Sequence, residues 1–289
     1  MRRLILQMLF LVLPPHALAA DAVSCTLCKA WNEPQQPFRI YGNTYYVGMK
    51  GLSAILVTSD QGHVLLDAAL PQSAPEIAKH VRALGFRVED IKLILNSHVH
   101  YDHAGGISQM QWQSGAKVAA SPWSAAVLRS GKPARDDPQY GVVEDIVPVG
   151  NVQVIKDGQV LKVGALSLTA HFTPGHTPGG TSWSWKSCEG NVCYNMVYAD
   201  SLMAVSADKF TFSNKKWAKD GFAKSFAVLN SLPCDILLTP HPEFSDLFKK
   251  YEDRGGSGVV HNRAACRTFA ASMRAVYDKR LAGEKAAIP

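Results

Sequence analysis

The stretch NSHVHYDHAGG, residues 96–106, ends an apolar run and carries three histidines and one aspartate within six positions. If the backbone stays extended into this stretch, the side chains of His98 and His100 point to the same side, because side chains alternate along a strand. Asp102 and His103 come at a turn into a helix and can point away from that pair. The stretch therefore predicts two neighbouring metal sites at the end of a β-strand.

Two further histidines stand at turns rich in Gly or Pro, each after a predicted strand. His176 lies in TPGHTPGG, residues 173–180, and His241 lies in LTPHP, residues 238–242. A lone loop histidine is usually a surface residue, but the first cluster makes both candidates for metal ligands. Imidazole and carboxylate groups suit zinc, which in catalytic sites keeps one position open for water. The histidines without such a setting are His16, His63, His80, His171 and His261.

The rest of the chain predicts an α/β fold. The predicted strands cover residues 38–47, 54–58, 64–67, 91–96, 152–155, 159–163, 166–172, 181–185 and 196–199. The predicted helices cover residues 73–84, 216–232 and 263–281. Strand clusters flanked by helices in both halves predict a four-layer αβ/βα sandwich, in which two mixed β-sheets pack face to face with helices outside. A segment rich in Pro and Asp, residues 131–141, predicts a mobile loop.

The first twenty residues are typical of a signal peptide. Arg2 and Arg3 supply positive charge, residues 4–13 form an apolar run, and Ala17-Leu18-Ala19 is a small-residue cleavage site. The apolar run is shorter than the roughly 20 residues that a membrane span needs. We therefore expect an exported protein, periplasmic or secreted, with one domain over residues 21–289.

The six cysteines are an even number in a chain expected to be exported, which favours disulfides over free thiols. Proximity in the sequence favours the pairing of Cys188 with Cys193, and leaves Cys234 with Cys266 and Cys25 with Cys28. The alternative is a structural zinc site made from Cys25, Cys28, Cys188 and Cys193, and an oxidising compartment argues against it.

The chain resembles the metallo-β-lactamase superfamily, because His98-x-His100-x-Asp102-His103, His176 and His241 follow the order and spacing of that family's metal ligands. Three other segments look like class B, subclass 3 zinc β-lactamases, which have no cysteine ligand. These segments are YGNTYYVG at residues 41–48, GHTPGGTSW at residues 175–183 and YADSL at residues 198–202. The resemblance implies that His98, His100 and His176 bind a first zinc ion, and that Asp102, His103 and His241 bind a second.

The resemblance also implies the activity, which is hydrolysis of the β-lactam ring of penicillins, cephalosporins and carbapenems, and hence antibiotic resistance. On this resemblance, a hydroxide held by two zinc ions would attack the ring carbonyl, the first zinc would polarise the carbonyl oxygen, and the second would stabilise the nitrogen leaving group. Asp102 would orient the hydroxide, and Ser201 would orient a water at the second metal. Asp200 is either a seventh ligand or a residue that supports a ligand.

Substrate contacts are expected from loops. Gln139 matches a position that approaches the substrate in related enzymes, although a solvated loop glutamine is an equally good interpretation. Related enzymes often carry Ser or Thr two residues after Ser201, whereas this chain has Met203, which cannot donate a hydrogen bond. The substrate carboxylate would then need Ser201, a backbone amide or a water. Trp31 and Tyr101 are candidates for the walls of the site.

Other functions remain as alternatives on the same fold, which hosts many activities. An exported lactonase or thioester hydrolase is the main one, and the expected export together with the subclass-like segments favours the β-lactamase. A di-iron redox protein is disfavoured because its family has Glu where His100 stands, and a non-catalytic zinc protein would not need six ligands. The net charge of +6 falls to 6 − 2 = +4 without Arg2 and Arg3. The remaining cations are scattered, so we expect no nucleic-acid partner. We expect the chain to be a monomer whose partner is a small-molecule β-lactam substrate.

Overall fold

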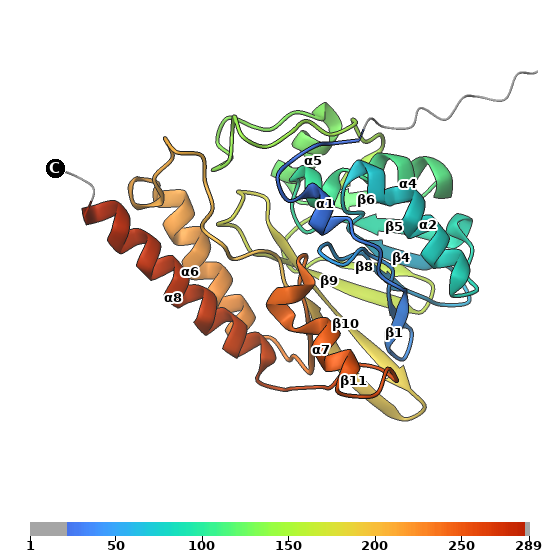
Figure 1. The fold of residues 1–289 in the computed structure, drawn as a ribbon. Helices are drawn as coiled ribbons and strands as arrows, with labels where there is room; N and C mark the ends of the chain where they lie inside the picture. The colour runs from blue at the N-terminus through green and yellow to red at the C-terminus, as the bar shows by residue number, and fades with distance from the viewer. Residues whose placement is uncertain (1–21, 287–289) are drawn as a thin grey trace, which may run out of the picture.

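The structure is a computed structural model that describes residues 22–286. The predicted signal peptide lies outside the described residues. Two mixed β-sheets pack face to face between two layers of helices (Figure 1), which confirms the predicted four-layer sandwich. None of the helices in the described part of the chain is both long and apolar enough to cross a membrane.

The first sheet has seven strands, which lie in the order of the sequence. They are β1 (Phe38–Tyr41), β2 (Thr44–Tyr46), β3 (Ile55–Val57), β4 (His63–Leu66), β5 (Ile91–Leu95), β6 (Lys117–Ala120) and β7 (Val152–Val154). Neighbours are antiparallel up to β4 and parallel from β4 to β7. Parallel neighbours need crossovers, and here the crossovers contain α2 (Ala74–Ala83), α3 (Tyr101–Ala104), α4 (Ile107–Ser114) and α5 (Pro122–Ser130).

The second sheet has five strands in the order β12-β11-β10-β9-β8. They are β8 (Val160–Val163), β9 (Leu166–Phe172), β10 (Thr181–Glu189), β11 (Val192–Tyr198) and β12 (Ile236–Leu238). The long helices α6 (Lys216–Ser231) and α8 (Ala265–Ala286) lie side by side on its outer face (Figure 1). Within residues 22–286, the remaining helices are α1 (Cys28–Trp31), α7 (Leu247–Glu252) and four short 3-10 turns.

Strands that are buried on both faces explain the apolar runs in the sequence. On β4, Leu65 packs in the core cluster that contains α2 and α4, while Val64 and Leu66 pack toward the second sheet. The core between the sheets also holds Trp183 and Tyr198, both fully buried. The two sheets are therefore joined by one central core, with a further core under each helical layer.

Several sequence predictions need correction. Residues 38–47 were expected as one strand but form the hairpin β1–β2, because Gly42 takes a positive φ of 50° that a continuous strand does not allow. The short elements α1, α5, α7, β6 and β12 were not predicted. The apolar runs that form β6 and β12 have only four and three residues, too few to carry a period that separates strand from helix. The turn before α5 did carry a signal, since the Ser121 side chain caps it by accepting from the Ser124 N–H, with Pro122 at the first position.

The six cysteines lie in the three pairs favoured by the sequence. The structure places the sulfur atoms of Cys25 and Cys28, Cys188 and Cys193, and Cys234 and Cys266 at disulfide distance. Cys188 and Cys193 are direct partners in the β10–β11 hairpin, and Cys234 connects the segment before β12 to α8. The disfavoured alternative, a zinc site of four cysteines, is contradicted by the structure, because Cys25 pairs with Cys28 and Cys188 pairs with Cys193.

Candidate active site

Four loops bring the predicted site residues together at one edge of the sandwich. Strands β9, β11 and β12 run in the same direction, since β9 and β11 are each antiparallel to β10 and β12 is parallel to β11. Their carboxyl ends lead to His176, Ser201 and His241 respectively. The end of β5 reaches the same place, because the Thr181 N–H donates to the Ser97 carbonyl at 2.8 Å and the Trp183 indole donates to the Asn96 carbonyl at 3.1 Å.

The first cluster consists of His98, His100 and His176. One ring nitrogen of each lies within 4.8 Å of the others, and all three side chains are buried. His100 keeps an extended backbone, with φ −76° and ψ 151°, so the alternation expected from the sequence does place it beside His98. The cluster could hold a metal ion.

The second cluster consists of Asp102, His103 and His241, whose ligand atoms again lie within 4.8 Å of one another. Oδ2 of Asp102 is 3.2 Å from Nε2 of His103 and 3.4 Å from Nε2 of His241. The rings of His98 and His103 are 4.4 Å apart between centroids, so the two clusters are adjacent. One short segment, residues 98–103, therefore supplies ligand candidates to both clusters, and its last part, α3, carries Asp102 and His103.

The electrostatics suit metal binding. Burial lowers the pKa of His98 well below its usual value and lowers the pKa of His176 to about 3. Both imidazoles are therefore neutral at neutral pH, which is the form that binds a metal. Burial opposes ionisation of Asp102, but the charge of His103 and hydrogen bonds to His103 and His241 hold its pKa well below the usual range.

An unpartnered buried atom provides a test of fit. Nε2 of His98 is buried and has no hydrogen-bond partner among the described residues, since Asp200 contacts only Nδ1 of this ring. A buried polar atom without a partner is costly unless something binds it. Neutral imidazole and ionised carboxylate groups match the donor set of zinc, so the residues present fit a metal at each cluster.

Each histidine of the first cluster also has a fixed outer partner. Nδ1 of His98 lies 2.7 Å from Oδ1 of Asp200, and Nδ1 of His176 lies 2.7 Å from the Met203 carbonyl oxygen. Asp200 is in neither group of ligand candidates and is fully buried behind His98. The structure therefore places it as a partner of His98 rather than as a bridge between clusters.

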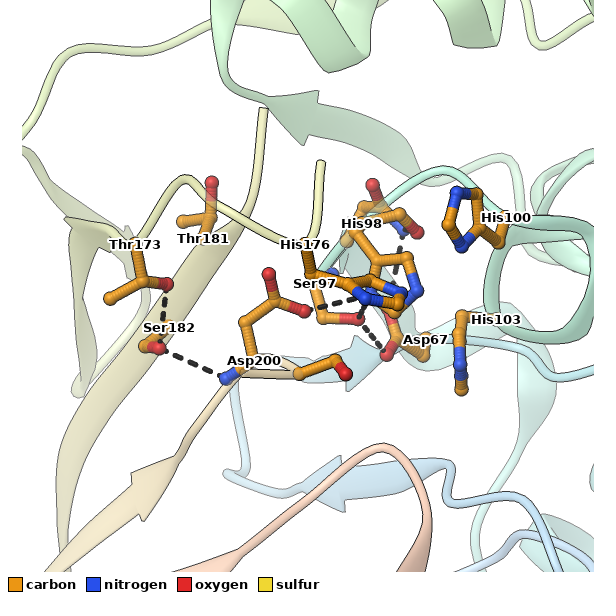
Figure 2. Close-up of polar contacts among 12 residues, drawn as sticks. Asp67, Ser97, His98, His100, His103, Thr173, His176, Thr181, Ser182 and Asp200 are labelled. Carbon is orange, nitrogen blue, oxygen red and sulfur yellow. Dashed lines mark hydrogen bonds and ion pairs between the residues drawn. The ribbon is translucent and has the colours of Figure 1, made fainter. Parts of the chain in front are cut away.

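A hydrogen-bond network holds the β5 loop in place (Figure 2). Asp67, at the end of β4, accepts from the Ser97 N–H at 2.7 Å and from the Ser97 hydroxyl. It also accepts from the Tyr198 hydroxyl at 2.8 Å. On the other side, the Ser182 hydroxyl accepts from the Asp200 N–H at 2.9 Å. Residues from both sheets therefore hold the segment that carries His98 in place through hydrogen bonds.

Gly106 and Gly180 lie where the backbone passes too close to neighbouring atoms for a side chain to fit. A Cβ at Gly106 would lie 2.2 Å from the Ala68 carbonyl oxygen, and a Cβ at Gly180 would lie 2.3 Å from Oδ2 of Asp200. Any side chain would therefore push apart the turn that carries Asp102 or the contact that holds Asp200. This requirement is the physical reason for glycine in AGG and PGG at these positions.

Both clusters face one pocket of about 320 Å³, a size suited to a small molecule. The structure brings all the predicted substrate contacts to this pocket, namely Gln139, Ser201 and Met203, together with Trp31 and Tyr101. Further lining residues that the sequence did not indicate are Leu27, Val143, Val205, Glu243 and Phe244. His63, His80, His171 and His261 lie outside both clusters, as expected.

Two aspartates near the clusters were missed by the sequence reasoning. Asp67 supports the β5 loop, and Asp137 lies 3.1 Å from Nε2 of His100. Asp67 ends a predicted strand, a common place for functional residues, but Asp137 lies beside Asp136 in a polar loop and gives no signal of its own. Only the fold distinguishes these two neighbours.

Comparison with known proteins agrees with the site. A family model described as the metallo-beta-lactamase superfamily matches residues 49–188. The structure of MEM-A1, a subclass B3 metallo-beta-lactamase from a soil metagenome library, is 49% identical, with a TM-score of 0.86 over 89% of this chain and 99% of that chain. The structure of Rm3 metallo-beta-lactamase is 51% identical, with a TM-score of 0.87 over 91% and 100%.

The curated sequences that match are less similar. The chain aligns with 59%, 30% and 55% of the length of the first three of these relatives. Among them, an N-acyl homoserine lactonase of a Bacillus species is 27% identical over 44% of this chain and 55% of its own length. The family model, the fold and near-complete alignment with two solved relatives agree with the two clusters described above. The chain belongs to the metallo-β-lactamase superfamily.

Proposed function

We propose that this protein is a zinc-dependent β-lactamase that opens the ring of penicillins, cephalosporins and carbapenems and so confers antibiotic resistance. The observation that carries the proposal is one pocket faced by both ligand clusters, in a chain that aligns with two β-lactamases over about nine tenths of its length. Identity of 49% and 51% to those enzymes supports their reaction over that of the lactonase, at 27%.

The first cluster would hold one zinc ion through His98, His100 and His176, and the second cluster another through Asp102, His103 and His241. When bound, zinc supplies a Lewis acid that polarises a carbonyl and lowers the pKa of a coordinated water to about 7. No serine nucleophile is then required. Because the imidazoles of His98 and His176 are neutral before zinc binds, they bind zinc at neutral pH without first losing a proton.

The side chains around the clusters then orient the reactants. Asp102 is ionised and accepts hydrogen bonds, so it can hold a proton of the attacking water at its carboxylate. Ser201 and Gln139 line the pocket and offer neutral donors to a substrate carboxylate. Met203 lines the same wall without a donor, while its backbone carbonyl orients His176.

None of the described residues that line the pocket is Lys or Arg. The carboxylate that all these antibiotics carry would therefore be held by uncharged donors and by the metal charge. The apolar side chains of Trp31, Val143 and Phe244 line the pocket and would cover the rest of the substrate. We expect recognition to depend weakly on salt, since screening acts on exposed charges.

Export to the periplasm or the exterior is part of the proposal. In the part of the chain that the structure describes, every cysteine is paired at disulfide distance, which supports an oxidising compartment. An antibiotic must also be destroyed before it reaches targets outside the inner membrane. We propose that the mature enzyme acts there as a monomer.

The test is hydrolysis by the purified mature chain loaded with zinc. Loss of carbapenem and penicillin absorbance should be rapid, should stop after treatment with EDTA, and should return when zinc is added. His176→Ala and Asp102→Ala should each lose nearly all turnover while their far-UV spectra stay like that of the wild type. His261→Ala, which changes an exposed histidine outside both clusters, is the matched control and should keep full activity.

The same preparation separates the alternatives. Turnover of an acyl homoserine lactone without β-lactam hydrolysis, in a chain carrying two zinc ions, would replace the proposed function with that of a lactonase. A chain that takes up zinc and opens neither ring would indicate a metal-binding protein. Wild-type activity in His176→Ala would remove this residue from the site.

A further inference from the structure

We propose that Asp137 is a positioning residue that fixes the orientation and the tautomer of His100, and so sets the affinity of the first cluster for zinc. The inference rests on the proposed zinc site. Both carboxylate oxygens of Asp137 lie near Nε2 of His100, at 3.1 Å and 3.2 Å. Asp137 is only 3% exposed, so water competes little for this contact.

The contact decides which nitrogen of His100 is free. A carboxylate only accepts hydrogen bonds, so Nε2 of His100 carries the proton and donates it to Asp137. Nδ1 then keeps its lone pair, and a metal binds that lone pair. In the structure the amide of Gln139 contacts this same Nδ1 at 3.3 Å, so the amide must leave before Nδ1 can bind a metal.

The loop holds Asp137 firmly enough for this role. The Asp137 N–H donates to the Ala134 carbonyl at 3.0 Å, and the Gln139 N–H donates to Oδ1 of Asp137 at 2.8 Å. The Pro138 carbonyl accepts from the Ala207 N–H at 2.9 Å, which connects the loop to the segment after β11. Residues 131–141 are thus a loop, as predicted, but a loop anchored to the site at Asp137.

The other ligand candidates show why this partner matters. Nδ1 of His241 lies near the Gly51 carbonyl at 3.1 Å, and Nδ1 of His176 lies near the Met203 carbonyl. A backbone carbonyl cannot be removed by mutation of its side chain. His98 and His100, in contrast, each depend on a side-chain carboxylate, and that of His100 comes from a loop 37 positions away. The orientation of His100 can therefore be disturbed without touching any ligand.

The experiment measures zinc affinity by competition with a coloured chelator. A His241→Ala background weakens the second cluster, so that the titration reports on the first. In that background, Asp137→Ala should weaken zinc binding by about 10–100-fold, the usual effect of losing such an outer partner. Asp137→Asn keeps an acceptor oxygen and should fall between Asp137→Ala and the unmodified background.

Asp136 provides the matched control. It carries the same charge in the same loop, but it is exposed and contacts the Trp123 indole at 3.0 Å instead of His100. Asp136→Ala should therefore leave zinc affinity within about threefold of the background, less than the loss expected for an outer partner. In a His176→Ala background, which weakens the first cluster instead, Asp137→Ala should have no effect.

Equal zinc affinities for Asp137→Ala and Asp136→Ala would overturn the proposal. If Asp137→Ala fails to fold, as judged by its zinc-free melting curve, nitrogen-15 spectra of the zinc-free wild type decide. A proton on Nε2 of His100 supports the role, and a proton on Nδ1 contradicts it. If the chain binds zinc but opens no β-lactam, the proposed function is refuted. Zinc affinity and the position of the proton on His100 still test the role of Asp137 in that case.

Discussion

Replacement of Asp67 should be among the most damaging single changes outside the ligands. Asp67 is fully buried and accepts from the Ser97 N–H, the Ser97 hydroxyl and the Tyr198 hydroxyl. Asp67→Ala leaves these three buried donors without their acceptor. An unsatisfied buried donor costs about 1–3 kcal/mol, so the free energy of unfolding should fall by about 3–9 kcal/mol. Even the lower bound is a large part of the about 5–15 kcal/mol that stabilises a typical domain.

The assay is thermal unfolding of the zinc-free chain, followed by circular dichroism. A loss of about 3 kcal/mol corresponds to a decrease in Tm of about 6–12 °C for a protein near this size. Asp67 also has a φ of 56°, which Asp and Asn tolerate better than other residues. Asp67→Asn therefore keeps the backbone preference and one acceptor oxygen, and it should lose less stability than Asp67→Ala.

Asp60→Ala is the control, because Asp60 is an exposed aspartate in the turn before β4. Its Tm should stay within about 2 °C of the wild type, as for most surface substitutions. A Tm for Asp67→Ala within about 3 °C of the wild type would refute the reasoning. It would mean that water or a rearranged side chain satisfies the donors at little cost.

Three further changes have defined outcomes. Met203→Ser should lower KM for penicillins by about 2–10-fold, the effect of one added hydrogen bond. Burial opposes ionisation of Glu284, but its bond to Arg280 and backbone N–H donors hold its pKa below 4.5. The lowered pKa stabilises the fold above pH 4.5, so the stability difference between wild type and Glu284→Gln should shrink in zinc-free chains as pH falls below 4.5. Removing the Cys234–Cys266 pair, 32 residues apart, should cost about 3–4 kcal/mol in denaturant unfolding.

Each of these has an outcome that contradicts it. An unchanged KM in Met203→Ser, with Met203→Leu as the apolar control, would remove the missing hydroxyl from the account of specificity. A difference for Glu284→Gln that is constant from pH 7 to pH 3 would show that its charge does not stabilise the fold. Identical denaturation midpoints with and without the Cys234–Cys266 pair would show that this pair is not bonded in the purified protein.

Much of the candidate site could be predicted because its signals are local. The i, i+2 spacing of His98 and His100 puts both side chains on one face of an extended segment, whatever the rest of the chain does. Asp102 and His103 diverge because a turn follows. His176 at its glycine-rich turn was predicted from the same kind of local pattern.

Other features could not be predicted from the sequence, because contacts between distant segments determine them. Strands β6 and β12 are short apolar runs that become strands only through pairing with neighbours already in place. The hairpin at Gly42 was not predicted, because residues 38–47 as a whole have a composition typical of one strand. These segments have weak preferences of their own, and the sheets decide their conformation.

Residue types and spacings within single strands and turns predicted the class of fold, the individual ligand candidates and the turns that present them, whereas the division of all six ligands into two groups came from the resemblance to the family. Which outer partner each ligand receives depends on the packing of distant segments. This packing separates buried Asp137 from exposed Asp136, assigns Asp200 to His98 and places Asp67 under the β5 loop. These partners come from residues 30 to 102 positions away. No local pattern encodes such a pairing, because the packing of the two sheets brings the partners together.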